Sequence, residues 1–284
     1  MDKHKQQILN FGLYIVSTPI GNMEDITLRA LNVLKKSEII LCEDTRRSGK
    51  LLSHFEIKNK LMSYHKFNEK KITDKIIHYI KNEKIVSLIS DAGTPTISDP
   101  GLVLVKRCFE ENLNIYPIPG ASAVTSAISV CGFSDQYLFY GFLTKKDNEL
   151  NKVLTSLSNI DYTIVFFIPG IKINFYISKF KKFFFDRQIF IAKEMTKIYE
   201  NFIRDKVEFI GSQPEGQKGE FTVVISEKIK DKKSKKEINE SVKMEIKKMI
   251  NKYSHKDVVE FISKKEDLPK KMIYNFCLSI KKKS

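Results

Sequence analysis

Short apolar runs alternate with amphipathic segments along the first 133 residues. Strands are predicted by apolar runs at 13–16, 38–42, 61–64, 84–89 and 114–117. Helices are predicted by apolar side chains at helical spacing in 27–36, 69–82 and 100–112. This alternation is typical of an α/β layer with a mostly parallel sheet, whose ligands bind beyond the carboxyl ends of the strands. The loops that follow these strands are therefore where we look for a site.

A second α/β domain is predicted after residue 133. Its strands correspond to apolar runs at 137–143, 163–167, 188–191 and 221–225, with a helix near 148–157. Residues 228–236 form a Lys-rich linker, and three short helices are expected beyond it, one opened by a capping box at 254–257. We therefore divide the chain into an N-terminal domain (1–133), a second domain (134–227), and a basic linker with a helical tail module (228–284).

The composition is that of a folded protein: 42% of the 284 residues are hydrophobic. No apolar run approaches the roughly 18–20 residues that span a bilayer, and residues 1–7 lack the apolar core of a signal peptide. We therefore expect a soluble cytoplasmic protein without a membrane partner. The four cysteines are scattered, as expected of reduced core thiols, and the histidines lack ligand spacing, so we expect no metal site.

Positive charge is concentrated near the C-terminus. Residues 228–284 contain 18 Lys and 8 Asp or Glu, which is +10 of the chain's net +15. Such a surface suits a polyanion, either nucleic acid or anionic lipid, although Lys runs are often only solvated faces. The three predicted helices fit a helix-turn-helix-like module or a plain packing appendage, and we favour contact with nucleic acid.

Four loops after predicted strands carry the candidate chemistry. Residues 17–27 make a tight turn but contain neither a dinucleotide fingerprint nor a P-loop. Residues 90–101, Ser-Asp-Ala-Gly-Thr-Pro-Thr-Ile-Ser-Asp-Pro-Gly, combine carboxylates, hydroxyls and small residues, which suits a neutral or cationic polar ligand. The alternative is a helix start capped by Asp99 before Pro100. Residues 117–127 are rich in small side chains, and Glu43-Asp44-Thr45-Arg46-Arg47 follows the second strand.

Taken in order, these motifs resemble the ribosomal RNA small subunit methyltransferase I family, a branch of the tetrapyrrole methylases. The resemblance rests on Thr-Pro-Ile-Gly-Asn at 18–22, on residues 43–46, 90–95, 98–101 and 119–123, and on Gly-Phe-Leu at 141–143 with Lys146. It extends through 192–197 and Gly219-Glu220, so it spans nearly the whole chain.

This resemblance implies two α/β domains of the class III methyltransferase type with a helical tail, usually as a homodimer. It implies S-adenosylmethionine in the cleft and 2′-O-methylation of a cytidine in the decoding region of 16S rRNA in the small ribosomal subunit. The implied cofactor residues are Ile20, Asp91, Gly93, Thr94, Ser122, Ala123 and Ala192. The candidate catalytic residues are Glu43, Asp44, Arg46, Lys146 and Glu194. Arg46, Lys146 and Lys197 are candidate phosphate ligands, and Tyr140, Phe142 and Phe167 are candidate base-stacking residues that also suit a core.

Two other functions stay open. Residues 166–172 read Phe-Phe-Ile-Pro-Gly-Ile-Lys where family members usually have Phe-Tyr-Glu-Ser-Pro-His-Arg, which favours a noncatalytic RNA-binding or ribosome assembly factor. A tetrapyrrole C-methyltransferase would usually have Gly-x-Gly-x-Gly-Asp in the first loop, where this chain has Ser-Thr-Pro-Ile-Gly-Asn. Membrane-surface binding through the Lys-rich tail is the least favoured, because the tail lacks an amphipathic helix with exposed aromatic anchors.

Overall fold

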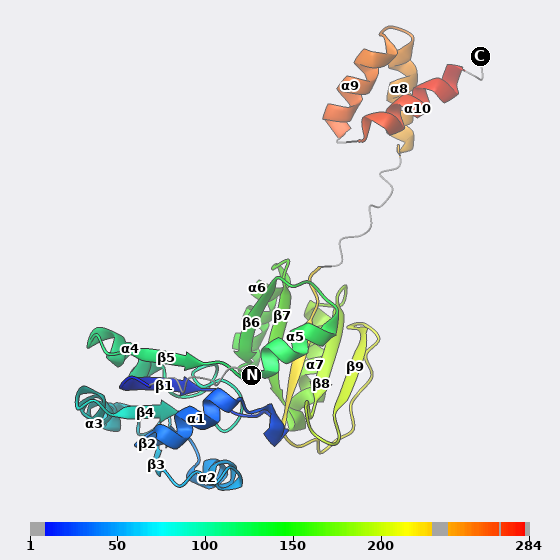
Figure 1. The fold of residues 1–284 in the computed structure, drawn as a ribbon. Helices are drawn as coiled ribbons and strands as arrows, with labels where there is room; N and C mark the ends of the chain where they lie inside the picture. Colours follow the sequence, from blue (N-terminus) through cyan, green and yellow to red (C-terminus); the bar gives the residue numbers. More distant parts are fainter. Residues whose placement is uncertain (1–8, 229–237, 267, 282–284) are drawn as a thin grey trace, which may run out of the picture. The chain divides into compact units, whose positions relative to one another are not determined.

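The computed structural model describes residues 9–228, 238–266 and 268–281 (Figure 1). The chain divides into two compact units, residues 1–228 and 229–284. The first unit contains two five-stranded sheets and the second is helical. The predicted linker lies outside the described residues except for Lys228.

The first sheet is entirely parallel, with the strand order β3-β2-β4-β1-β5. Its strands are β1 (Gly12–Val16), β2 (Ile39–Cys42), β3 (Lys60–Ser63), β4 (Ile85–Leu88) and β5 (Ile115–Ile118). Its helices are α1 (Leu28–Lys36), α2 (Thr45–His54), α3 (Glu69–Lys81) and α4 (Leu102–Glu110), with a 3-10 turn, η1 (Met23–Asp25), before α1. Side chains of α3 and α4 pack in one core and those of α1 and α2 in another, which covers the sheet on both faces. The central strands β1, β2 and β4 are consequently mostly apolar and buried, whereas the edge strand β3 is only partly buried.

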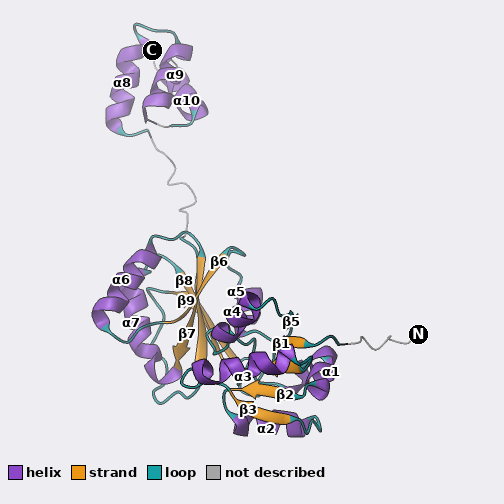
Figure 2. Ribbon diagram, turned by 90° about the vertical axis from the view of Figure 1, so that its left-hand side faces the viewer, coloured by secondary structure: helices purple, strands orange, loops and turns teal. Residues whose placement is uncertain are grey.

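The second sheet is mixed, with the order β6-β7-β10-β8-β9. Its strands are β6 (Tyr137–Phe142), β7 (Thr163–Pro169), β8 (Gln188–Lys193), β9 (Asn201–Lys206) and β10 (Glu220–Ile225). Only β6 and β7 are parallel to each other. Helices α6 (Asp147–Ser158) and α7 (Ile173–Phe183) cover one face, and α5 (Ala123–Cys131) covers the other (Figure 2). The 3-10 turn η2 (Gly170–Lys172) joins β7 to α7.

Helix α5 belongs by sequence to the first domain but packs on the second sheet. Val124, Ala127 and Cys131 of α5 share a core with Val165 of β7 and Val224 of β10. Because α5 directly follows β5 and Ser122, it carries the chain from one sheet to the other and holds the two sheets together.

A buried arginine joins the end of α6, the loop after it and the end of β10. Arg187 is 1% exposed, and its guanidinium donates to the carbonyls of Ser158, Ile160, Tyr162 and Ser226 at 2.6–3.3 Å. Planar guanidinium groups present several donors in a fixed geometry, so one side chain satisfies carbonyls at the ends of α6, of the loop after it, and of β10.

The C-terminal unit consists of α8 (Glu240–Ile250), α9 (His255–Glu266) and α10 (Lys270–Lys281). It has its own apolar core, to which Ile246, Val258, Ile262 and Ile273 contribute. Ser254 accepts a hydrogen bond from the backbone of Asp257 at 3.3 Å, as the predicted cap requires. The four cysteines of the chain are free and buried, as expected.

The interpretation of Asp99 as a helix cap is wrong. Helix α4 begins at Leu102, and its N-cap residue is Gly101, with φ +131°. A Cβ at position 101 would lie 2.6 Å from Leu88 Cδ2 and 2.8 Å from Thr96 Cγ2, and this backbone conformation itself favours glycine. The helix therefore starts at Leu102, and the carboxyl group of Asp99 does not cap it.

Candidate active site

The loops after β1, β4 and β5 meet at the carboxyl edge of the first sheet. Thr18 and Gly93 exchange two backbone hydrogen bonds, at 2.9 and 3.0 Å. The hydroxyl of Thr94 lies 3.0 Å from that of Ser17 and donates to the carbonyl of Ala121 at 3.3 Å. Three of the four loops singled out in the sequence are thus fastened into one structure.

Small residues make this close approach possible. Gly93 has φ +79°, and a Cβ there would lie 3.4 Å from Ile20 Cγ2. A Cβ at Gly120 would lie 2.9 Å from Ser17 Cβ. The glycines in these motifs therefore serve packing between loops, and they also leave backbone atoms accessible to a ligand.

The first loop continues into contact with the second sheet. The backbone N–H of Asn22 donates to Thr196 Oγ1 at 3.0 Å, in the turn after β8. A side chain at Gly21 would lie 2.7 Å from the carbonyl oxygen of Met195. A second contact joins the loop after β4 to β6, because a Cβ at Gly141 would lie 3.0 Å from Ser98 Oγ. The two sheets therefore meet along this edge, toward which the strands of the first sheet run (Figure 1).

Unusual backbone conformations concentrate on the same loops. Thr96 and Ser98, after β4, have φ values of +70° and +71°, and Glu194 and Thr196, after β8, have +53° and +64°. A residue other than glycine in this region costs on the order of 1 kcal/mol or more, and such residues gather at functional sites. The observation therefore marks the two loops at the junction of the sheets as a candidate site.

Asp91 organises the polar side of this edge. One carboxylate oxygen accepts from the backbone N–H of Asp44 at 3.3 Å, and the other accepts from Arg47 Nη1 at 3.2 Å. The loop after β4 is thereby joined to the loop after β2. Arg47 was not among the candidate residues, although it lies in the same motif as Arg46.

Asp99 is the other residue that the sequence did not single out as a site residue. Burial raises its pKa to about 6, and the nearby charge of Glu43 acts in the same direction. A hydrogen bond with Ser90 opposes both effects. Only the tertiary structure reveals this environment, because Asp99 and Glu43 lie on different loops.

The candidate catalytic residues differ in their surroundings. Asp44 caps α2 by accepting from the backbone of Arg46, and the side chain of Arg46 also donates to both of its oxygens. These hydrogen bonds lower the pKa of Asp44 to about 2. Glu43 is exposed beside this pair. Asp44 is therefore held as an anion and is a poor proton acceptor.

The other two candidates lie on the second sheet's side. Glu194 accepts from Lys197 Nζ at 3.0 Å in the turn after β8. Lys146 lies at the start of α6, where its ammonium pairs with Glu149 at 3.0 Å. Glu194 and Lys197 thus belong to the junction, whereas Lys146 pairs within its own helix.

The expected cofactor residues converge from both sheets. Ile20 and Ala123 pack in the same cluster as Ala192 of β8. Ser122 caps α5 by accepting from the backbone of Thr125 at 3.5 Å. Because Ala192 is 1% exposed, any contact that it makes with a ligand is through its backbone.

This set of side chains fits S-adenosylmethionine chemically. The ligand combines a sulfonium cation with a neutral nucleoside. The edge offers the carboxylate of Asp91 for the cation, the apolar surfaces of Ile20 and Ala123 for the nucleoside, and loop backbone for its polar groups. Within the described residues no three His, Cys, Asp or Glu side chains form a group that could hold a metal ion.

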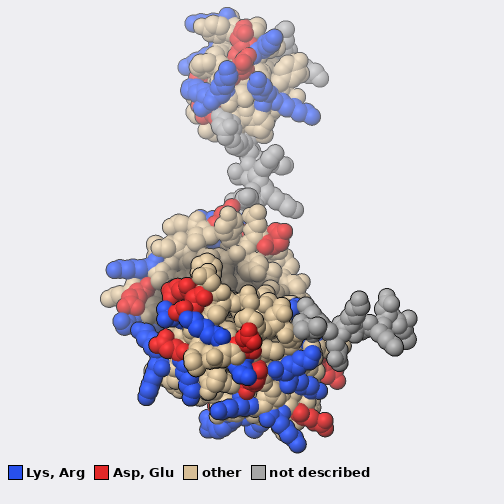
Figure 3. Space-filling view, turned by 60° about the vertical axis from the view of Figure 1, so that its left-hand side comes forward, with Lys and Arg blue, Asp and Glu red and all other residues tan. Residues whose placement is uncertain are grey.

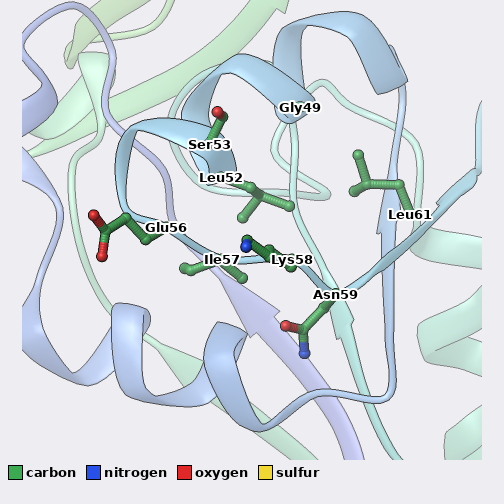
Figure 4. A pocket seen from close by; sticks show the side chains of 8 residues that line it. All are labelled: Gly49, Leu52, Ser53, Glu56, Ile57, Lys58, Asn59 and Leu61. Carbon is green, nitrogen blue, oxygen red and sulfur yellow. The ribbon is translucent and has the colours of Figure 1, made fainter.

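A separate pocket of about 560 Å³ lies between α2 and β3 (Figure 4). Its floor is partly fixed by Asn59, whose amide donates to the carbonyls of Lys35, at 3.2 Å, and Ser37. None of the candidate residues lines it; the lining residues are Gly49, Leu52, Ser53, Glu56, Ile57, Lys58, Asn59 and Leu61.

Comparisons with known proteins identify the family of this chain. Residues 12–210 match the family of Tetrapyrrole (Corrin/Porphyrin) Methylases. Over its full length the chain is 34% identical to 98% of "Ribosomal RNA small subunit methyltransferase I" of Neisseria meningitidis serogroup A. Over 78% of its length it is 44% identical to 92% of the protein of that name from Mesomycoplasma conjunctivae.

Solved structures share the fold at low sequence identity. Diphthine synthase has a TM-score of 0.61 at 14% identity, over 75% of this chain and 89% of that one. Uroporphyrin-III-C-methyltransferase from Thermus thermophilus has a TM-score of 0.54 at 17% identity, over 75% and 93%. The predicted fold class, two α/β domains of the class III methyltransferase type with a helical C-terminal module, is confirmed. Among the described helices none is long and apolar enough to cross a bilayer.

Proposed function

Because the chain belongs to the ribosomal RNA small subunit methyltransferase I family of the tetrapyrrole methylases, we propose that it methylates the 2′-oxygen of a cytidine in the decoding region of 16S rRNA. The family establishes an S-adenosylmethionine-dependent methyltransferase. The observation that carries the RNA substrate is the identity to relatives of that name over the whole chain, tail included. The reaction is expected in the bacterial cytoplasm, where small subunits are assembled.

The cofactor residues are proposed to be Ile20, Asp91, Gly93, Thr94, Ser122, Ala123 and Ala192. S-Adenosylmethionine supplies a methyl group that the positive sulfonium already activates. The protein then has to hold the ribose hydroxyl in line with that methyl group, which requires well-ordered loops. The hydrogen bonds among Ser17, Thr94 and Ala121 keep the loops ordered in this way.

Proton removal from the ribose hydroxyl is assigned to Asp99. The carboxylate of Asp99 would take the hydroxyl proton as the ribose oxygen accepts the methyl group, while the methyl–sulfur bond of the cofactor breaks and its electron pair stays on the sulfur of the departing thioether. A proton acceptor is most effective when its pKa lies near the working pH, and a pKa of about 6 suits Asp99 better than a pKa of about 2 suits Asp44. Glu43 and Glu194 are the other candidates at this edge.

Contacts with RNA phosphates are assigned to exposed cations. Arg46 and Lys197 border the junction of the sheets, and Lys146 lies at the start of α6. Lys side chains are also spread over the visible face of the C-terminal unit (Figure 3), which we propose as an additional RNA-binding module.

A second copy of the chain is the proposed partner in a homodimer. Ile198, Tyr199 and Phe202 lie close together in sequence around the turn into β9 and are exposed, Ile198 to 95%. Monomeric proteins rarely leave such apolar groups uncovered. Light scattering of the purified chain tests this proposal, and a mass of one chain at micromolar concentration contradicts it.

A noncatalytic RNA-binding factor is the alternative that one observation favours. Residues 168–172, at the end of β7 and in η2, lack the acidic residue, the histidine and the arginine that relatives usually have there. A protein that binds S-adenosylmethionine and RNA without transferring a methyl group supports this alternative.

The decisive experiment is methyl transfer from radiolabelled S-adenosylmethionine to small ribosomal subunits from a strain that lacks this protein. Nucleoside analysis is expected to give labelled 2′-O-methylcytidine. Label in another nucleoside corrects the target, whereas no label with cofactor binding retained in calorimetry favours the noncatalytic factor. Loss of both transfer and cofactor binding contradicts the proposed function.

A further inference from the structure

The loop after β3 holds an aromatic side chain in an unusually exposed position. Phe67 is 98% exposed, and its ring lies 5.9 Å from the ring of His65, at an angle of 64°. Burying a Phe side chain contributes about 1.5–3 kcal/mol, so the fold forgoes this contribution at Phe67. The question is what the exposed ring contacts in the working enzyme.

This loop is ordered by its own hydrogen bonds. Asn68 Oδ1 accepts from the backbone of His65 at 2.9 Å, and Asn68 Nδ2 donates to the carbonyl of Ser63 at 3.1 Å. The backbone N–H of Phe67 donates to His65 Nδ1 at 3.2 Å. Tyr64, at the base of the loop, is buried and hydrogen-bonded to Thr73 of α3. The two rings therefore stand on a fixed turn.

Sheet pairing places this turn beside the candidate active site. β3 pairs with β2, with Ser63 opposite Cys42, and the backbone of Tyr64 donates to the carbonyl of Cys42 at 2.8 Å. The motif at 43–47 directly follows Cys42, and Arg47 of this motif pairs with Asp91 at the proposed cofactor site. One continuous edge thus leads from the aromatic turn to the proposed cofactor site.

Cations lie on the turn and on the neighbouring helix α2. Lys66, Lys70 and Lys71 are exposed on or next to the turn. The side chains of Arg46 and Arg47, at the start of α2, are 87% and 71% exposed, and they pair with Asp44 and Asp91. In the view that brings the first sheet forward, Lys and Arg side chains crowd the lower surface of this unit (Figure 3). Fixed aromatic rings among cations are the combination that binds single-stranded RNA, because every base has a face that stacks and every phosphate attracts a cation.

We propose that Phe67 and His65 form a stacking platform for an unpaired base of the substrate RNA, with Arg46 and Lys66 beside the phosphates of that strand. The platform rests on the proposed function, since it acts on the RNA that carries the target ribose. Its role is positioning: it holds a nucleotide near the target while the residues at the junction of the sheets carry out the transfer.

Substitution of Phe67 tests the platform. In Phe67→Ala, the KM for small ribosomal subunits is expected to rise about 5- to 150-fold, the range that loss of one stacked base implies. The affinity for S-adenosylmethionine in calorimetry is expected to stay unchanged. Phe67→Trp restores most of the RNA affinity, because a larger ring also stacks. The matched control is Phe109→Ala, which removes a ring that is 80% exposed at the last turn of α4.

A binding measurement separates this inference from the proposed function. Fluorescence anisotropy with labelled single-stranded oligocytidine RNA needs no turnover, and Phe67→Ala is expected to weaken binding where Phe109→Ala does not. Equal RNA affinity in both variants and the unsubstituted chain overturns the platform, even if methyl transfer is intact. A Phe67→Ala variant that binds RNA normally but no longer dimerises in light scattering also overturns it. Absence of methyl transfer by the unsubstituted chain contradicts the proposed function instead.

Discussion

Asp99 shows how a single side chain comes to depend on pH. Its carboxyl group lies in the loop after β4, partly buried, and faces the negative charge of Glu43. Both conditions disfavour the ionised form, so its pKa is raised from 3.8 to about 6. The ionised carboxylate of Asp99 therefore destabilises the folded state, and this ionised form is the one that a proton acceptor needs.

We predict that Asp99→Asn removes a pH-dependent part of the stability. Because the folded-state pKa lies above the unfolded value, the folded chain binds more protons between about pH 4 and 6, and its stability falls as pH rises through that window. Relative to the unsubstituted chain, Asp99→Asn is expected to gain about 2 kcal/mol of unfolding free energy from pH 4 to pH 7. This is somewhat less than the free energy that corresponds to the full pKa difference, because the side chain is partly exposed.

Urea unfolding at pH 4 and pH 7 measures this difference, with Asp25→Asn in the exposed turn η1 as control. A constant difference between Asp99→Asn and the unsubstituted chain across this pH range would show that the carboxyl group is not perturbed by its surroundings.

Two loop elements, residues 17–22 and 193–197, decide how the sheets meet. The contact depends on Gly21, where a Cβ would lie 2.5 Å from Lys197 Cγ, 2.6 Å from Thr196 Oγ1 and 2.7 Å from the carbonyl of Met195. The Lys197 side chain can move, but the carbonyl belongs to a turn whose backbone is already strained at Glu194 and Thr196. Even the smallest side chain at this position therefore separates the loops.

Gly21→Ala is predicted to weaken binding of S-adenosylmethionine at least about tenfold, because a shift of the loops disturbs groups that must converge on one ligand. The matched control is Gly49→Ala in α2, where the nearest atom to the new Cβ is 3.9 Å away. In a helix this change stabilises by about 0.5–1 kcal/mol. Calorimetry and urea unfolding of both variants check the pair, and unchanged cofactor affinity in Gly21→Ala would mean that the junction does not shape the site.

At the scale of the whole molecule, the chain consists of two units with separate cores. The first unit contains the proposed active site, and the second has its own core between α8, α9 and α10. Residues 229–284 contain 17 Lys and 8 Asp or Glu, which is +9 of the net +15, so most of the net positive charge is outside the unit with the proposed chemistry. Separate cores imply that the first unit folds without the second.

A chain that ends at Lys228 is predicted to keep its affinity for S-adenosylmethionine and to bind RNA more weakly. The dependence of RNA affinity on salt should also become shallower, since each lost phosphate contact reduces the slope of log K against log salt concentration by about 0.7 for single strands. Filter binding at several salt concentrations measures both effects. An unchanged slope would indicate that the lysines of the tail are only solvated.

Local pattern predicted most elements of the fold. The five strands of the first sheet and helices α1, α3 and α4 were expected from apolar periodicity, because each buries a regular stripe or run of side chains. Helices α2 and α7 and strand β9 were not predicted. β9 is an edge strand whose side chains are mostly exposed, so no apolar alternation marks it. α7 buries Ile173, Tyr176, Ile177 and Phe180, which are spaced at i, i+3, i+4 and i+7, so the sequence does contain the helical period of this element.

The sequence by itself determined the fold class and the family, because hydrophobic periodicity and short ordered motifs are local properties. The sequence also singled out the loops that contain Asp91, Thr94 and Ser122, which lie at one edge of the first sheet in the structure. Only the tertiary structure decided which side chains face one another. The strand order β3-β2-β4-β1-β5 does not follow the chain. The raised pKa of Asp99 and the link from Arg47 to Asp91 therefore arise from neighbours that are distant in sequence.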